Sequence, residues 1–276
     1  MLRELGRRAI VGYMMGGDDF AFSVRKTYFE KIRGRAMTVV WDDARRLFVV
    51  SDDTGVVHVA RKERVRLQNM GVAARRNRLI REYLGGADLI RPGDVIIDCG
   101  ANIGEFAVAC AMAGGCVHAF EPDPKEFGAL VANATGDITT VNEALWHSTE
   151  TLKFYDNNAS GDSSLIDTGI ADAVLEIKGT RLDEYALRAG INNVRLIKIE
   201  AEGAEPEVLD GAGDLLDYSD YITVDMGPER GVSQENTVVA VNDRLIERGF
   251  RLIHFDNIRF CGLFERVDLS KSRGVA

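Results

Sequence analysis

The sequence predicts an α/β protein with a Rossmann-like parallel sheet that ends in an antiparallel hairpin. Three observations support this fold class. From residue 92 onward, short apolar runs alternate with helical stretches, as in βαβ units. A glycine-containing turn at residues 98–105 joins an apolar strand to a helix. Two further apolar runs, 250–255 and 258–264, close the pattern as a hairpin.

The chain is long and apolar enough for one large domain with an accessory unit. It has 276 residues, and 46% of them are hydrophobic, which suffices to bury a full α/β core. Residues 37–60 hold three β-rich runs separated by the turn-like segments DDAR and SDDTG, and this predicts a small antiparallel meander. We therefore expect a small N-terminal α+β module at residues 1–84 and the main domain at 85–276.

Positive charge is concentrated ahead of the main domain. Residues 1–91 carry 19 Lys and Arg against 11 Asp and Glu, whereas the rest of the chain carries 15 against 32. The densest part, residues 61–81, leads into a predicted amphipathic helix. Its cationic face is either solvated and close to acidic groups, or in contact with an anionic substrate. The cationic face holds Arg75, Arg76, Arg78 and Arg81, and the apolar face Val72, Leu79, Ile80, Tyr83 and Leu84.

The main domain alternates strands and helices. Candidate strands are DVIID, VHAFE, TTVNEA, VRLIKIE and YITVDM, whose apolar character is typical of a sheet covered on both faces. The second helix has the clearest start, because Asp123 is a good N-cap, Pro124 suits the first helical position and Glu126 completes a capping box. Near the end, Asp256-Asn257 predicts a two-residue hairpin turn. The helices are expected at residues 103–112, 124–134, 204–216 and 237–248.

The motif DCGANIGE at residues 98–105 points to a nucleoside ligand. Gly100 and Gly104 allow a tight turn and close packing of the helix, whose N-terminus directs free amides at a ligand. A dinucleotide fingerprint requires glycine where Asn102 stands, which disfavours a pyrophosphate and an NAD dehydrogenase. Glu121 ends the next strand, where a carboxylate can accept both hydrogen bonds of a ribose diol. S-adenosylmethionine (SAM), which has no phosphate, fits this combination.

The third strand leads into Glu143 and Ala144. There a carboxylate would accept a hydrogen bond from an exocyclic amine, and the apolar strand end would contact an adenine ring. The alternative is a solvent-facing acid beside an apolar strand end. We expect Glu143 and Ala144 to complete the cofactor site.

The fourth strand runs into the charged sequence LIKIEAEGAE. A period of two places Lys198, Glu200 and Glu202 on one face, which is unusual in a sheet covered on both sides. Because ligands bind outside the carboxyl ends of the strands, we expect this cluster and Glu205 to be the catalytic group. One carboxylate would act as general base, with Glu202 first, and Lys198 would orient the acceptor. The alternative is a structural Lys–Glu ion pair, and no complete set of metal ligands is evident.

Five motifs of the main domain resemble those of the FkbM-type methyltransferases. In chain order they are IDCGANIGE, HAFEPDP, VNEALW, TRLDEYA and LIKIEAEGAEPEVLDGA. These methyltransferases are class I SAM enzymes that mostly methylate hydroxyls of sugars, glycans or polyketide-type products. The resemblance covers residues 93–264 and implies that residues 198–205 border the methyl-transfer site. The residues that it assigns to SAM binding are Asp98, Gly100, Asn102, Gly104 and Glu121.

Two positions depart from the pattern of that family. The usual Asp of the KID-x-EGAE motif is Glu200 here, and a Glu common near the end of the fifth strand is replaced by Asp225. Both substitutions keep the negative charge and change its reach.

The resemblance implies a SAM-dependent O-methyltransferase with a small-molecule or glycan acceptor, an anionic one if the basic helix contacts it. One rival is a nucleic-acid methyltransferase, but the main domain is acidic and lacks an NPPY or DPPY motif. The other is a SAM-binding module without catalysis. No apolar run approaches the roughly 18 to 20 residues of a membrane span. No signal peptide or paired cysteine motif is evident, so we expect a cytoplasmic protein with reduced thiols.

Overall fold

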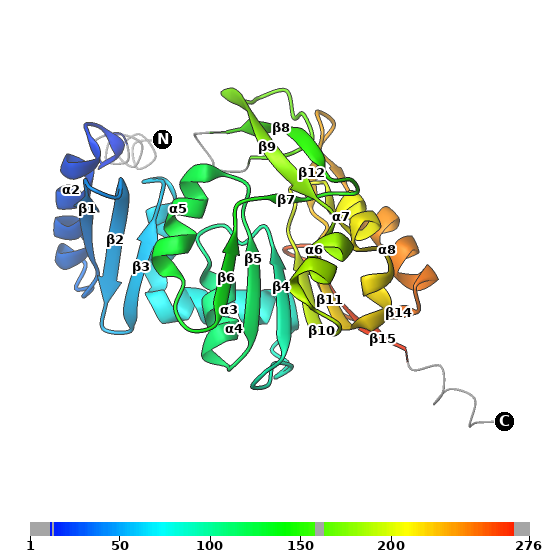
Figure 1. Ribbon diagram of the computed structural model, residues 1–276. Helices are drawn as coiled ribbons and strands as arrows, with labels where there is room; N and C mark the ends of the chain where they lie inside the picture. Colours follow the sequence, from blue (N-terminus) through cyan, green and yellow to red (C-terminus); the bar gives the residue numbers. More distant parts are fainter. Residues whose placement is uncertain (1–11, 13, 158–162, 268–276) are drawn as a thin grey trace.

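The computed structural model describes residues 12, 14–157 and 163–267 (Figure 1). Its centre is a seven-stranded sheet in the order β14-β15-β11-β10-β4-β5-β6. Strands β11, β10, β4, β5 and β6 are parallel, and β15 is antiparallel to both of its neighbours. The predicted Rossmann-like sheet with a terminal hairpin is thus confirmed. The strands are β4 (Val95–Cys99), β5 (Cys116–Phe120), β6 (Ile138–Val141), β10 (Val194–Ile199), β11 (Ser219–Asp225), β14 (Phe250–Asp256) and β15 (Cys261–Arg266).

Helices cover both faces of this sheet because successive apolar residues point to opposite sides of each strand. Ile96 and Leu196 pack against α3, α4 and α5 on one face, and Ile97 and Ile199 pack against α6, α7 and α8 on the other. Gly213, with φ of 51°, ends α7 earlier than predicted, and a 3-10 helix follows it. The bounds are α3 (Val72–Leu84), α4 (Glu105–Met112), α5 (Pro124–Asn133), α6 (Leu182–Ala189), α7 (Glu205–Ala212), η2 (Gly213–Tyr218) and α8 (Val238–Glu247).

The predicted antiparallel meander is present at the N-terminal side of the molecule, next to α5 (Figure 1). A further helix, α2, packs against it through Phe22, and the same apolar core includes Ile103 and Ala129 of the main domain. Helix α3 joins the core of the main sheet through Tyr83. The boundary between residues 84 and 85 stays a prediction. The elements are α2 (Asp19–Ile32), β1 (Thr38–Asp42), β2 (Leu47–Asp52), β3 (Gly55–Val59) and η1 (Arg64–Met70).

Small sheets accompany the main sheet, and the predicted third strand TTVNEA is divided between β6 of the main sheet and β7 of one of the small sheets. One has the strand order β7-β9-β8 and stands beyond the carboxyl ends of the main parallel strands (Figure 1). The other is the antiparallel pair of β12 and β13. Because β7, β8 and β9 pair over long separations, their neighbours in sequence give no sign of the pairing. The strands are β7 (Ala144–Leu145), β8 (Glu150–Asp156), β9 (Ala173–Thr180), β12 (Pro228–Arg230) and β13 (Glu235–Asn236).

Two local predictions need correction. The hairpin turn is not the two-residue Asp256-Asn257, because β14 extends to Asp256 and β15 begins only at residue 261. The Asp256 carboxylate instead accepts hydrogen bonds from the backbone amides of Ile258 and Arg259, which stabilises a wider loop. Asp123 does cap α5, but the Glu126 carboxylate bonds to Arg61 and does not complete the predicted capping box.

No helix among the described residues is both long and apolar enough to cross a membrane. Residues 1–11 and 13, which form part of the segment on which the signal-peptide prediction depends, lie outside the described part of the chain. The four cysteines are free, and three of them are buried.

Candidate functional site

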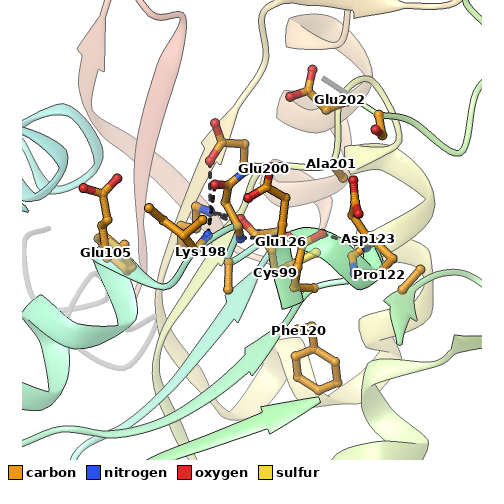
Figure 2. Close-up of a pocket in the computed structure, with 18 of the residues that line it drawn as sticks. Cys99, Glu105, Phe120, Pro122, Asp123, Glu126, Lys198, Glu200, Ala201 and Glu202 are labelled. Carbon is orange, nitrogen blue, oxygen red and sulfur yellow. Dashed lines mark hydrogen bonds and ion pairs between the residues drawn. The ribbon is translucent and has the colours of Figure 1, made fainter. Parts of the chain in front are cut away.

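A cavity opens where β4, β5, β6 and β10 end, at the edge where the strand order reverses between β4 and β10 (Figure 2). It encloses about 1110 Å³ of space between atoms, a figure that includes the part open to solvent. Ligands of open α/β sheets bind at this reversal of strand order. The predicted residues that line it are Gly100, Asn102, Glu121, Glu143, Ala144, Lys198, Glu200 and Glu202.

The turn after β4 has the tight geometry that the glycines predicted. Gly100 has φ of +70°, and a Cβ there would lie 1.9 Å from the carbonyl oxygen of Glu200. Asn102 also adopts a positive φ of 51°. Gly104 lies behind the cavity wall, where a Cβ would approach the Leu130 side chain to 2.6 Å. Gly100 therefore lets two loops meet at the cavity, and Gly104 lets α4 approach α5.

Glu121 is buried at the end of β5, and its carboxylate faces the turn. Oε2 accepts a hydrogen bond of 2.7 Å from the Asn102 amide, and Oε1 accepts one of 2.8 Å from the Asp123 amide. Burial raises the pKa of Glu121 to about 8, although both amides favour the charged form. A carboxylate has about four acceptor positions, so each oxygen keeps one for a ligand hydroxyl.

Glu143 lies in the wall beyond the end of β6. Its Oε1 accepts from the Lys178 ammonium at 2.5 Å. Its Oε2 is buried and has no hydrogen-bond partner among the described residues. Ala144 beside it is buried and apolar. This wall therefore offers one unused acceptor next to apolar surface.

Lys198 is buried beneath the turn and links the two strands at the reversal. Its Nζ lies 3.1 Å from Asp98 Oδ1 on the neighbouring strand and 3.0 Å from Glu200 Oε2. It also donates to the carbonyl oxygen of Gly100 at 2.7 Å. Although burial disfavours its charge, Asp98 and Glu200 raise the pKa of Lys198 above its ordinary value. Its Nζ also donates to the carbonyl oxygen of Cys99 at 3.2 Å, so carboxylates and backbone carbonyls together surround the ammonium.

Glu200 lies between two cations. Its second oxygen, Oε1, accepts from Arg259 Nη2 at 2.9 Å, and the same Arg259 atom lies 2.7 Å from Asp225 Oδ2. Burial acts to raise the pKa of Glu200, but Lys198 and Arg259 outweigh it and hold the pKa at about 2. A carboxylate with so low a pKa is a weak base at neutral pH. Lys198 and Glu200 thus form the ion pair that the sequence left open as the alternative to a catalytic cluster, within a larger network.

The predicted face of three charged side chains does not continue to Glu202. Strand β10 ends at residue 199, and Glu202 has a positive φ of 49°, so the period of two no longer applies. Glu202 is half-buried at the rim of the cavity, away from Lys198 (Figure 2). The turn separates it from Glu200.

Glu205 lies behind this loop and fixes it. Its Oε1 accepts from the amides of Ala201 and Gly203 at 3.1 and 2.9 Å, and its Oε2 accepts from Thr237 Oγ1 at 2.9 Å. Burial raises the pKa of Glu205 to about 7. Its geometry is that of a side chain that holds the backbone carrying Glu202.

Several side chains near the cavity were not among the predicted site residues. Arg259 comes from the terminal hairpin, 59 positions beyond Glu200, and no local pattern marks it. Glu229 is half-buried near Asp225, and burial with the negative charges of Asp225 and Glu200 raises its pKa to about 8. Gln68 and Arg75 line the opposite end of the cavity. Among the described residues no three His, Cys, Asp or Glu side chains form a metal-binding group.

Comparison with known proteins gives one family and two curated relatives. A model of the methyltransferase FkbM domain matches residues 98–252. Hexuronic acid methyltransferase AglP of Haloferax volcanii is 29% identical over 163 residues, covering 53% of this chain and 64% of that protein. The 31-O-demethyl-FK506 methyltransferase FkbM of Streptomyces tacrolimicus is 31% identical over 167 residues, covering 48% and 64%. The match thus spans slightly less than two thirds of each relative's length.

Solved structures with a similar fold are more distant. The magnesium protoporphyrin IX methyltransferase of Synechocystis PCC 6803, solved with bound SAM, is 12% identical, with a TM-score of 0.43 and coverage of 75% of this chain and 83% of that chain. A structure described as a putative RNA methyltransferase of Pyrococcus horikoshii is 16% identical, with a TM-score of 0.38 and coverage of 72% and 83%.

Proposed function

The chain belongs to the methyltransferase FkbM family, and on that premise we propose that it is a SAM-dependent O-methyltransferase acting on a hydroxyl of a sugar, glycan or natural product. The observation that carries the proposal is the cavity at the strand ends, which two adjacent strands line with a carboxylate each, the buried Glu121 and the half-buried Glu143. Curated relatives named for a hexuronic acid and for 31-O-demethyl-FK506 support the acceptor class.

The residues of the cavity fit the nucleoside of SAM. Glu121 keeps one acceptor position on each oxygen for the ribose hydroxyls. The unpartnered Oε2 of Glu143 suits the exocyclic amine of adenine, and Ala144 supplies apolar surface beside it. Two further residues support the turn from behind. Asp98 does so through its ion pair with Lys198, and Gly104 does so by allowing close contact with α5.

When bound, SAM supplies an activated methyl group that an acceptor oxygen can displace in line. The chain has to orient the acceptor and remove its proton. We propose Glu202 as the general base, because it lines the rim and sits on a constrained loop. Ser164 Oγ donates to the Glu202 carbonyl at 2.8 Å, and Glu205 binds the next amide. Glu200 is less suited, because its two cations keep it ionised and weakly basic.

The first test is ligand binding to the full chain. S-adenosylhomocysteine should bind with a stoichiometry of one by calorimetry, and NADH should not compete with it. Binding of NADH in place of S-adenosylhomocysteine would refute the methyltransferase assignment.

The second test is methyl transfer. A hexuronic acid glycoside and the corresponding neutral glycoside, each incubated with SAM, should be compared for the gain of one CH₂ by mass spectrometry. With an accepted substrate, Glu202→Gln should lower kcat by about 10² or more, the usual scale of a lost general base, and leave S-adenosylhomocysteine affinity unchanged. Glu235→Gln makes the same change at an exposed position and is the matched control. An unchanged kcat in Glu202→Gln would assign the base elsewhere, and Glu229→Gln tests the next candidate.

A further inference from the structure

One end of the cavity is built by residues that precede the family-matched region. Gln68 comes from η1 and Arg75 from α3, and both line the cavity with Glu105 of α4. Figure 2 shows Glu105 on one side of the hollow and Pro122 and Asp123, which follow Glu121, on the other side. The two ends of the cavity therefore carry different chemistry.

Gln68 presents an unused acceptor. Its side chain is only 1% exposed, and its Nε2 donates to Glu105 Oε1 at 2.7 Å. This bond fixes the orientation of the amide, so the other atom is the oxygen. That oxygen, Oε1, is buried and has no hydrogen-bond partner among the described residues. A buried acceptor without a partner is unfavourable, and a ligand donor would remove that cost.

Arg75 presents unused donors beside it. Its Nε lies 3.3 Å from Glu105 Oε2, and its side chain is 13% exposed. Between described residues this is its one polar contact, which leaves Nη1 and Nη2 available to a ligand. The two nitrogens form a fork that matches a carboxylate in a bidentate arrangement. The same end thus combines a carboxylate-binding donor pair with the acceptors of Gln68 and Glu105.

A simple anion does not satisfy this arrangement, because an anion has no donor for Gln68 Oε1 and is repelled by Glu105. A group with a cation and an anion on one carbon satisfies both. We propose that Gln68 and Arg75 bind the α-amino acid end of SAM, with the ammonium at Gln68 Oε1 and Glu105 and the carboxylate at Arg75. The inference rests on the proposed function, and it makes the N-terminal segment part of the cofactor site.

The test compares three ligands by calorimetry on the full chain. S-adenosylhomocysteine carries the amino acid, S-adenosyl-3-thiopropylamine lacks only its carboxylate, and 5′-methylthioadenosine lacks the amino acid entirely. Arg75→Met should weaken the affinity for S-adenosylhomocysteine about 10- to 100-fold, which is the scale of lost hydrogen bonds to a charged group. It should change the affinity for 5′-methylthioadenosine less than about threefold. Gln68→Met should act in the same direction. Arg76→Met, on the same helix and outside this cavity, should change neither.

The outcomes separate the two proposals. The inference is wrong if Arg75→Met weakens the binding of S-adenosylhomocysteine and 5′-methylthioadenosine equally, or if it weakens the binding of neither. It is also wrong if the variant raises only the KM of an acidic acceptor. If that variant does not fold, the wild type still decides: it should prefer S-adenosylhomocysteine to the decarboxylated analogue at least tenfold, and equal affinities would overturn the inference. If the wild type binds 5′-methylthioadenosine as tightly as S-adenosylhomocysteine, only this inference fails. If it binds no adenosyl ligand, the proposed function fails with it.

Discussion

The state of Glu121 predicts how ligand binding depends on pH. Burial raises the pKa of this carboxyl to about 8, so it is mostly protonated at neutral pH in the free protein. Only the ionised form accepts a hydrogen bond from each ribose hydroxyl while it keeps both backbone amides. Binding therefore has to remove a proton below pH 8, and affinity should increase as the pH rises toward that value.

The magnitude follows from the linkage between binding and ionisation. Below the pKa, each pH unit lowers the ionised fraction tenfold, which is about 1.4 kcal/mol. Affinity at pH 6 should be about 100-fold weaker than the plateau above pH 8. Calorimetry with 5′-methylthioadenosine between pH 6 and 9 measures this without an amino acid on the ligand. Glu121→Gln should bind 5′-methylthioadenosine weakly, and its affinity should not change with pH.

Glu205→Gln is the control, because burial raises the pKa of Glu205 to about 7 and this side chain lies behind the wall. Its pH profile should keep the wild-type slope around pH 8. A flat wild-type profile between pH 6 and 9, or a slope that persists in Glu121→Gln, would refute the ribose assignment.

Two buried charge networks give stability predictions. Lys198→Met should lower the free energy of unfolding by about 3–5 kcal/mol, because Asp98 loses its buried partner, and the double variant with Asp98→Asn should recover part of the loss in urea denaturation. Arg61→Met should cost a similar amount, because Arg61 pairs with Asp123, Glu126 and Asp156 in a buried cluster. Arg61→Met should also weaken the binding of 5′-methylthioadenosine, because Arg61 holds Asp123, whose backbone amide donates a hydrogen bond to Glu121. Unchanged urea midpoints would contradict both predictions.

The fold was predictable because its signals are local. Strand β4, the glycine turn and α4 follow each other within 18 residues, and the N-cap Asp123 sets the start of α5 from its own side chain. The β7-β9-β8 sheet was less accessible, since β8 and β9 pair across a long intervening segment. Pairing of this kind depends on tertiary contacts and has weak sequence signals.

The site was predictable where one side chain and its strand end suffice. Glu121 and Glu143 line the cavity at the expected strand ends. Glu202 and Glu205 show the limit, because the extended pattern stops after β10 and the backbone turns at a positive φ that the sequence period does not reveal. Arg75 was expected on a solvated or substrate-facing surface of α3, and its pairing with Glu105 joins two separate helices.

The alternation of charges beneath the cavity limits which carboxylate can react. Asp98, Lys198, Glu200 and Arg259 form a chain in which each charge has an opposite neighbour. Lys198 and Arg259 favour the ionised form of Glu200 and hold its pKa at about 2, whereas burial outweighs Lys198 at Asp98 and raises the pKa of that carboxyl. The chain therefore suits a rigid, charged support under the turn better than proton transfer. Glu202 lies on the rim beyond this chain, where it lines the cavity. Exchanging Glu202 should therefore affect turnover, whereas exchanging Lys198 should affect folding.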